Sequence, residues 1–145
     1  MNFLGIIPAR YGSTRLEGKP LVIIAGKPMI QWVYEESCKA LDAVYVATDD
    51  VRIADAVRAF GGNVVMTSTN HENGTSRCLE AWNLINEIEG DVFDAALNVQ
   101  GDEPLLHHGS LEDLKRCFEG GETDFATLVI PVTAEEDLFN DPEVF

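Results

Sequence analysis

Apolar residues alternate along the chain between short continuous runs and longer stretches with helical spacing. The continuous runs predict buried strands at residues 3–8, 21–24, 43–47, 63–67, 93–99 and 125–132. The periodic stretches predict amphipathic helices at residues 28–39, 51–60, 75–88 and 110–118. Strands that alternate with helices in this way are typical of βαβ units. We therefore expect an α/β fold, with a mostly parallel sheet and helices on both of its faces.

Capping and turn residues support the predicted helices. Pro28 suits the first turn of the helix that it opens. The polar cluster at residues 48–50 is cap-like, and Gly61 follows the second helix as glycine often does at a helix end. Thr75 and Ser110 are the side chains expected to cap the two later helices.

Three polar loops, at residues 8–19, 67–77 and 98–104, each follow a predicted strand. In an open parallel sheet, ligands bind at the carboxyl ends of the strands. We therefore expect these loops to meet at one edge of the sheet and to form the functional site together.

The first of these loops is cationic. It carries Arg10, Arg15 and Lys19 among small residues, whose backbone N–H groups can approach phosphate oxygens closely. The whole chain has a formal net charge of −15, yet residues 1–30 hold four cations against one carboxylate, a balance of +3 that leaves −18 for the remainder. An acidic chain that concentrates its cations in this way is expected to bind an anion there. The loop has neither a P-loop pattern nor the GxGxxG fingerprint, which argues against an NAD-dependent oxidoreductase.

The other two loops offer a carboxylate and a further cation. Asp102 lies beside Gly101 at the end of a strand and is the natural ligand for Mg²⁺, which takes one or two carboxylates and completes its shell with phosphate oxygens and water. Glu103 is interpreted as an orienting or solvated neighbour. Arg77 falls in the first turn of a helix, where a cation opposes the helix dipole, so we expect it to have an anionic or polar partner.

Composition narrows the class of protein further. The net charge argues against non-specific nucleic-acid binding, which needs a basic surface. No apolar run approaches the roughly 20 residues of a membrane helix, and the N-terminus lacks a basic signal-peptide region. The cytoplasm is therefore the expected location. Three widely spaced cysteines suggest no disulfide framework or zinc site, and we expect buried thiols at Cys38, Cys78 and Cys117.

Five segments taken in order carry a resemblance to a known family. These segments are IIPARYGSTRLEGKPL, GKPMIQWV, VATDD, HENGTSRC and NVQGDEP. Together they resemble the 3-deoxy-manno-octulosonate cytidylyltransferase (CMP-KDO synthetase) family from the first strand to about residue 141. The resemblance implies a Rossmann-like nucleotidyltransferase of the nucleotide-diphospho-sugar transferase type. It also implies a magnesium-dependent enzyme that joins CTP and KDO into CMP-KDO and releases pyrophosphate, for lipopolysaccharide synthesis.

The resemblance also assigns roles to individual residues. Arg10 and Lys19 match cations that bind the triphosphate, and Asp102 matches the first magnesium aspartate. These three are the expected catalytic residues. The remaining residues expected to bind the nucleotide are Pro8 and Ala9, which read cytosine through their backbones, Ser13 and Arg15 in the same loop, and Thr75, Arg77 and Gln100, whose individual duties stay open.

The sequence departs from the family pattern in two respects. Glu17 stands where the family usually has Pro, and Asn73 and Ser76 replace what is usually Ser and an acid. Family members also continue well past residue 145, with a second half that supplies the rest of the sugar site, the main homodimer contacts and a second magnesium aspartate. We therefore interpret residues 1–145 as the nucleotide-binding part of a single truncated domain and expect weak or no catalysis from these residues alone.

Two alternatives stay open at this point. The acceptor could be another acidic sugar, as in a CMP-sialic acid synthetase, because the residues that read the acceptor lie largely beyond residue 145. The chain could also be a non-catalytic nucleotide-binding module whose acidic portion binds a partner. Nucleotide binding without turnover would favour the module.

Overall fold

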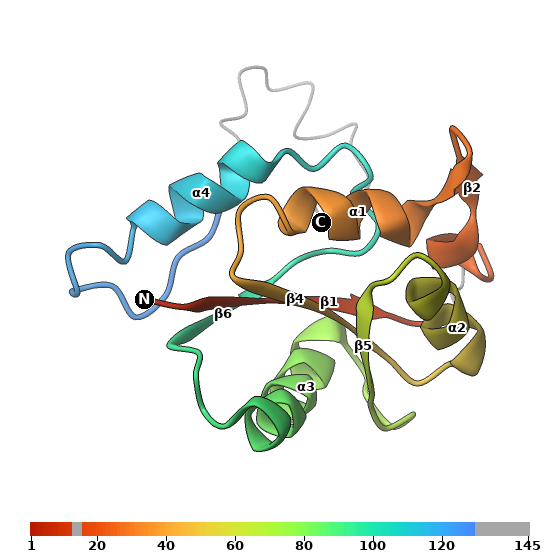
Figure 1. The fold of residues 1–145 in the computed structure, drawn as a ribbon, viewed down its shortest axis with the longest axis horizontal. Coiled ribbons are helices and arrows are strands. Elements are labelled where there is room, and N and C mark those ends of the chain that lie inside the picture. The colour runs from red at the N-terminus through yellow and green to blue at the C-terminus, as the bar shows by residue number, and fades with distance from the viewer. Residues whose placement is uncertain (13–15, 130–145) are drawn as a thin grey trace, which may run out of the picture.

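The computed structural model describes residues 1–12 and 16–129. Within these two segments, the main sheet has four parallel strands in the order β5-β4-β1-β6. The strands are β1 (Phe3–Ala9), β4 (Ala43–Thr48), β5 (Asn63–Met66) and β6 (Ala95–Asn98). The predicted α/β fold with a parallel sheet is confirmed (Figure 1).

Strand β1 lies at the centre of the sheet. Ile6 is in register with Tyr45 on one side and with Asn98 on the other. The side chains of Leu4, Ile6 and Ile7 are fully buried. A parallel strand covered on both faces is expected to be a continuous apolar run, and this is why the FLGIIPA segment takes the central position.

Helices cover both faces of the sheet (Figure 1). The helices are α1 (Met29–Ser37), α2 (Val51–Ala59), α3 (Gly74–Glu89) and α4 (His108–Arg116). Apolar side chains of α1, α2 and α4 pack with Phe3 and Ile7 in one core cluster. Helix α3 packs on the opposite face, where Ala81 and Ile85 meet Leu4 and Ile6. None of the described helices is both long and apolar enough to cross a membrane.

Two of the predicted strands differ in the structure. Residues 21–24 do not join the main sheet: a 3₁₀ turn, η1 (Lys19–Leu21), is followed by a small antiparallel hairpin of β2 (Ile23–Ile24) and β3 (Lys27–Pro28). Ala25 and Gly26 both have positive φ, which suits a tight two-residue hairpin turn. The strand predicted at 125–132 is wrong for residues 125–129, which pair with no neighbouring strand in the described part of the chain, and its last three residues lie outside the described residues.

Several smaller predictions are also corrected. Pro28 precedes α1 as its N-cap and does not lie within its first turn. Asn73 caps α3 and His107 caps α4, in place of Thr75 and Ser110, because their side chains accept hydrogen bonds from the backbone N–H groups of Ser76 and Gly109. The predicted cap of α2 is confirmed, since Asp50 accepts from the backbone of Arg52. Among the cysteines, Cys78 is buried as expected, whereas Cys38 and Cys117 are exposed at helix ends.

Glu36 joins α1 to α4 and gives the fold a dependence on pH. Its carboxylate forms an ion pair with Lys39 and accepts hydrogen bonds from the backbone N–H and the ring of His108. Lys39 first, and His108 as well, lower the pKa of Glu36 from 4.5 to about 2. A lowered carboxyl pKa stabilises the folded state above about pH 4.5, and this stabilisation is lost as the pH falls toward 2.

We expect Glu36→Gln to lower the melting temperature at pH 6. The difference in melting temperature between this variant and the unsubstituted chain should shrink as the pH falls toward 2. Thermal melts between pH 6 and pH 2 measure this difference. Glu87→Gln is the matched control, because Glu87 is exposed on α3. A difference between the Glu36→Gln variant and the unsubstituted chain that stays constant across this range would contradict the assignment.

Candidate functional site

The carboxyl ends of the four parallel strands carry the polar residues that the sequence singled out. Arg10 follows β1, Asp49 follows β4, Thr67 follows β5 and Asp102 lies four residues beyond β6. The ends of β4 and β5 are joined directly, because the Thr67 N–H donates to the Thr48 carbonyl at 2.9 Å. The prediction that three loops meet at one edge of the sheet is therefore confirmed.

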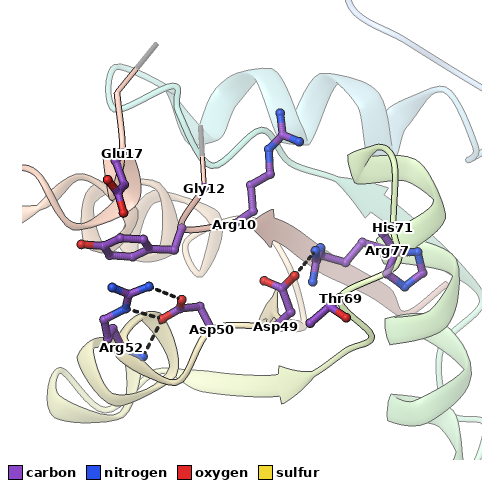
Figure 2. A pocket seen from close by; sticks show the side chains of 10 residues that line it. Arg10, Gly12, Glu17, Asp49, Asp50, Arg52, Thr69, His71 and Arg77 are labelled. Atoms are coloured by element: carbon purple, nitrogen blue, oxygen red, sulfur yellow. Dashed lines mark hydrogen bonds and ion pairs between the residues drawn. The ribbon is translucent and has the colours of Figure 1, made fainter. Parts of the chain in front are cut away.

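A pocket of about 410 Å³ opens at this edge, between the ends of β1, β4 and β5 (Figure 2). Three arginines, three carboxylates and one histidine give it a strongly polar lining. The lining residues are Arg10, Tyr11, Gly12, Glu17, Asp49, Asp50, Arg52, Thr69, His71 and Arg77.

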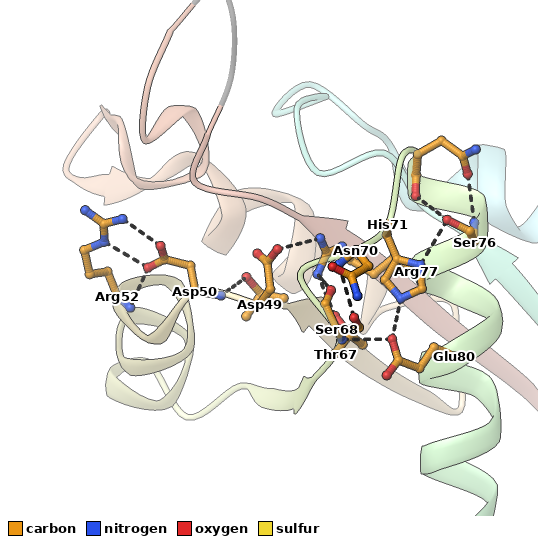
Figure 3. Close-up of polar contacts among 12 residues, drawn as sticks. Asp49, Asp50, Arg52, Thr67, Ser68, Asn70, His71, Ser76, Arg77 and Glu80 are labelled. Carbon is orange, nitrogen blue, oxygen red and sulfur yellow. Dashed lines mark hydrogen bonds and ion pairs between the residues drawn. The ribbon is translucent and has the colours of Figure 1, made fainter.

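Arg77 connects the strand ends that border this pocket. Its side chain projects from the first turn of α3 and is only 5% exposed. Its terminal nitrogen Nη2 donates to Asp49 Oδ2 at 2.9 Å. The other terminal nitrogen, Nη1, donates to Thr67 Oγ1 at 2.6 Å and to the Ser68 carbonyl at 3.4 Å (Figure 3). The expected anionic partner of Arg77 is therefore Asp49, and the guanidinium links α3 to the ends of β4 and β5.

A second set of contacts holds the start of the cationic loop. Arg52 bonds both oxygens of Asp50, at 2.9 and 2.6 Å, and this pairing lowers the pKa of the Asp50 carboxyl. The Arg52 guanidinium also stacks on the Tyr11 ring, 3.2 Å from its centroid. On the same ring, Gly18 approaches so closely that a Cβ atom there would lie 3.1 Å away. The Gly18 N–H donates to the Tyr11 carbonyl at 2.8 Å, so the two ends of the loop are held together around this ring.

Lys19 and Asp102 form an ion pair, and neither residue lines the pocket. Lys19 Nζ lies 2.7 Å from Asp102 Oδ2, and the side chains are 37% and 52% exposed. Glycine at position 101 lets the loop after β6 pack closely on the end of β1, because a Cβ there would lie 3.2 Å from the Pro8 carbonyl and from Ile7 and Ile30. The sequence paired the cationic loop with Asp102, and the structure brings these two side chains into contact.

The acidic residues fit a metal ion that takes one carboxylate from this part of the chain. The described residues contain no group of three or more His, Cys, Asp or Glu side chains that could enclose a metal. Asp102 nevertheless presents a half-exposed carboxylate that already contacts a cation. Mg²⁺ commonly binds through one or two carboxylates together with phosphate oxygens and water, so the chemistry of this site suits it.

The loop that follows β5 is fastened to α3 through Glu80 (Figure 3). The Ser68 N–H donates to Glu80 Oε2 at 2.9 Å, and His71 contacts the same oxygen through Nε2. The other ring nitrogen of His71 lies 3.1 Å from Ser76 Oγ. Hydrogen bonding from His71 and from Ser68 lowers the pKa of Glu80. His71 is thus held in place and forms part of the pocket wall.

The predicted site residues divide into several groups in the structure. Arg10 is exposed at the pocket and has no hydrogen-bond or ion-pair partner among the described residues. Pro8 and Ala9 form the end of β1, where Pro8 packs against Gly74. Thr75 and Gln100 are exposed and do not line the pocket. Ser13 and Arg15 lie outside the described residues.

Sequence reasoning did not select most of the residues that line the pocket, among them Tyr11, Asp49, Asp50 and Arg52. Asp49 could have been found, because it stands at the carboxyl end of a predicted strand just as Asp102 does. The stacking of Arg52 on Tyr11 joins residues 41 positions apart and has no local sequence signal.

A parallel α/β sheet whose carboxyl edge carries a cationic loop and a polar pocket is typical of proteins that bind phosphorylated ligands such as nucleotides. Comparison with known proteins identifies the family. The chain belongs to the cytidylyltransferase family, which it matches over residues 4–145.

Individual relatives agree with this assignment. The chain is 53% identical over 144 residues to the 3-deoxy-manno-octulosonate cytidylyltransferase of Parabacteroides distasonis, covering 97% of this chain and 56% of the relative. It is 56% identical over 136 residues to the enzyme of the same name from Bacteroides thetaiotaomicron, covering 94% and 53%. The chain thus spans about half the length of the curated relatives that it matches, and it corresponds to their N-terminal portion.

Solved structures show the same fold. A CMP:2-keto-3-deoxy-manno-octonic acid synthetase complexed with CTP superposes with a TM-score of 0.74 at 43% identity, covering 83% of this chain and 48% of that one. A cytidylyltransferase from Leptospira borgpetersenii superposes with a TM-score of 0.70 at 24% identity, covering 84% and 50%. The predicted nucleotidyltransferase fold and the family resemblance are confirmed.

Proposed function

We propose that this chain is the nucleotide-handling part of a CMP-KDO synthetase. The reaction transfers the cytidylyl group of CTP to the anomeric hydroxyl of KDO. The hydroxyl oxygen attacks the α-phosphorus, the bond to the bridging oxygen of the β-phosphate breaks, and pyrophosphate leaves while the hydroxyl proton passes to solvent. The observation that carries the proposal is the Lys19–Asp102 contact at the same sheet edge as the Arg10 pocket, in a chain whose relatives bear this name.

Positioning and charge stabilisation dominate catalysis in transfers of this kind. Arg10, whose guanidinium is unpaired among the described residues, would bind the triphosphate bidentately. Lys19 would neutralise the charge that grows on the departing pyrophosphate. Asp102 would hold Mg²⁺, which when bound polarises the α-phosphate.

The other predicted residues take supporting roles in this proposal. Pro8 and Ala9 would read the base through their backbones, and Ser13, Arg15, Thr75 and Gln100 would contact the nucleotide or the sugar. Arg77 acts differently, because its guanidinium is already hydrogen-bonded to Asp49, Thr67 and Ser68. It would hold the nucleotide-binding loops in place and would not contact the phosphates directly.

The remaining features follow from the family and from the length of its members. We propose that residues 1–145 are part of one nucleotidyltransferase domain, that a second half completes the sugar site and the homodimer, and that the enzyme acts in the cytoplasm in lipopolysaccharide synthesis. An acidic-sugar acceptor other than KDO is the second candidate. Pyrophosphate release measured with CTP and a panel of acidic sugars, KDO among them, separates the two.

Calorimetry with this chain tests the nucleotide site directly. We expect CTP to bind in the presence of Mg²⁺, and we expect Arg10→Ala to weaken binding by about tenfold to a hundredfold, the range for losing a charge-assisted hydrogen bond. Arg58→Ala is the control, because Arg58 is exposed on α2 and pairs only with Asp55 among the described residues. The proposal fails if CTP does not bind or if the two variants bind it equally.

A further inference from the structure

Asp49 lines the pocket but has no role in the proposed phosphate chemistry. It follows β4 directly, lines the pocket with Arg10, and is 18% exposed at its side chain. The proposed roles for Arg10, Lys19 and Asp102 account for the triphosphate and the metal. They leave the nucleoside end of the ligand without a side-chain partner in the pocket.

The Asp49 carboxylate is held in one orientation. Its Oδ2 accepts from Arg77 at 2.9 Å, and Arg77 is itself buried and fixed by Thr67 and Ser68 (Figure 3). Oδ1 accepts no hydrogen bond from the residues that the structure describes. The bond to Arg77 therefore orients the carboxylate so that one acceptor oxygen stays available at the pocket wall.

Most of the neighbouring polar groups are already paired. Asp50 uses both of its oxygens on Arg52, and His71 contacts Ser76 and Glu80 through its two ring nitrogens. Across the pocket, Arg10 supplies a cation without a partner among the described residues. The pocket thus presents a cation at one strand end and a fixed acceptor at the next, which suits a ligand that is anionic at one end and carries an N–H or O–H donor at the other.

We propose that Asp49 is a specificity-determining residue, whose Oδ1 accepts a hydrogen bond from the nucleoside. This inference rests on the proposed function. The donor is either the exocyclic amine of cytosine or a ribose hydroxyl, since both offer a hydrogen to a carboxylate. A carboxylate repels the carbonyl oxygen that uracil has in place of this amine. A site built to bond such a donor rejects an analogue that lacks it, because its own partly buried polar group is then left unpaired.

Calorimetry of the unsubstituted chain with Mg²⁺ and a nucleotide panel tests this inference and distinguishes the two donors. The panel is CTP, UTP, 2′-deoxy-CTP and 3′-deoxy-CTP. We expect CTP to bind at least about tenfold more tightly than the analogue that lacks the donor. Weaker UTP binding identifies the base amine, and weaker binding of a deoxy analogue identifies that ribose hydroxyl. Affinities within twofold of one another across the panel would overturn the inference without any variant.

Asp49→Asn gives a second, sharper result. Arg77 can only donate, so the amide oxygen of the new side chain turns toward Arg77 and its NH₂ group faces the pocket in place of the acceptor. If the base amine is the donor, the preference should reverse from CTP toward UTP. If a ribose hydroxyl is the donor, the discrimination against the deoxy analogue should fall.

Asp55→Asn is the matched control, because it makes the same change of charge on an exposed part of α2 outside the pocket. It should leave every affinity ratio unchanged. Unchanged ratios in Asp49→Asn, with CTP still bound, would overturn the inference but not the proposed function. Failure of the unsubstituted chain to bind CTP would overturn both.

Discussion

Lys19→Ala and Asp102→Asn are each expected to slow pyrophosphate release by at least about a hundredfold, a loss of about 2.7 kcal/mol of transition-state stabilisation. The rate is measured with CTP, KDO and Mg²⁺ in the chain extended to the length of its relatives. Lys19→Ala removes the cation that we propose stabilises the negative charge on the leaving pyrophosphate, and Asp102→Asn removes the carboxylate that we propose holds Mg²⁺. Both side chains are partly exposed, so their ion pair contributes at most about 1 kcal/mol to folding. A large loss of rate should therefore accompany a small change in melting temperature.

The chain provides a matched control for this experiment. Lys27 and Glu35 form an ion pair with an N–O distance of 2.6 Å, and Lys27 is 37% exposed, as Lys19 is. Their pair lies between β3 and α1 and does not line the pocket. Lys27→Ala and Glu35→Gln should leave the rate within about twofold of the unsubstituted enzyme. Near-normal turnover in Lys19→Ala or Asp102→Asn would remove that residue from the mechanism.

Arg77→Ala is expected to lower the free energy of unfolding by about 3 kcal/mol, which corresponds to a fall of about 10 °C in melting temperature for a chain of this size. The substitution deletes three hydrogen bonds and leaves the Asp49 carboxylate without its partner. Removing one member of a fully buried ion pair costs about 3–5 kcal/mol. The lower end of this range applies, because the Asp49 side chain keeps some contact with water.

Chemical denaturation or thermal melts measure the effect of Arg77→Ala. Arg58→Ala is the comparison, since its ion pair with Asp55 is exposed and lies within one turn of helix α2, where such pairs contribute about 0.5 kcal/mol or less. Arg77→Lys should retain part of the stability, because an ammonium keeps the charge but cannot bond Asp49 and Thr67 through separate nitrogens of one rigid group. Equal melting temperatures for Arg77→Ala and Arg58→Ala would show that Arg77 does not hold the loops together.

The architecture of the site could be predicted from sequence because it follows from one rule of parallel sheets. The strands that precede Arg10 and Asp102 are short, mostly apolar segments, and parallel strands bring their carboxyl ends to one edge. The need of Arg77 for an anionic partner also followed from its place in the first turn of a helix. The sequence did not predict which carboxylate pairs with Arg77, because this depends on the packing of helix α3 against strands β4 and β5.

Some of the helix caps and two of the strands could not be predicted correctly, because more than one local arrangement fits the sequence there. Asn73 and Thr75 are both acceptable caps, and the extended backbone of Asn73 decides between them. The apolar residues from Leu21 to Ile24 read as a strand of the main sheet, but positive φ angles at Ala25 and Gly26 turn the chain back on itself after a two-residue strand. Apolar content at residues 125–129 predicted a strand, and strand formation also requires an edge to pair with.

The separation of the Lys19–Asp102 pair from the pocket lining has a consequence for engineering. Asp49 and Arg77 are connected through Ser68 to Glu80, whereas Lys19 and Asp102, to which we assign the leaving-group chemistry, lie on the loops that follow β1 and β6. Libraries randomised at position 69, which lines the pocket but is not a partner of Arg77, could then explore new nucleobases without removing the Asp49–Arg77 ion pair. A change of nucleobase preference could therefore be selected separately from turnover.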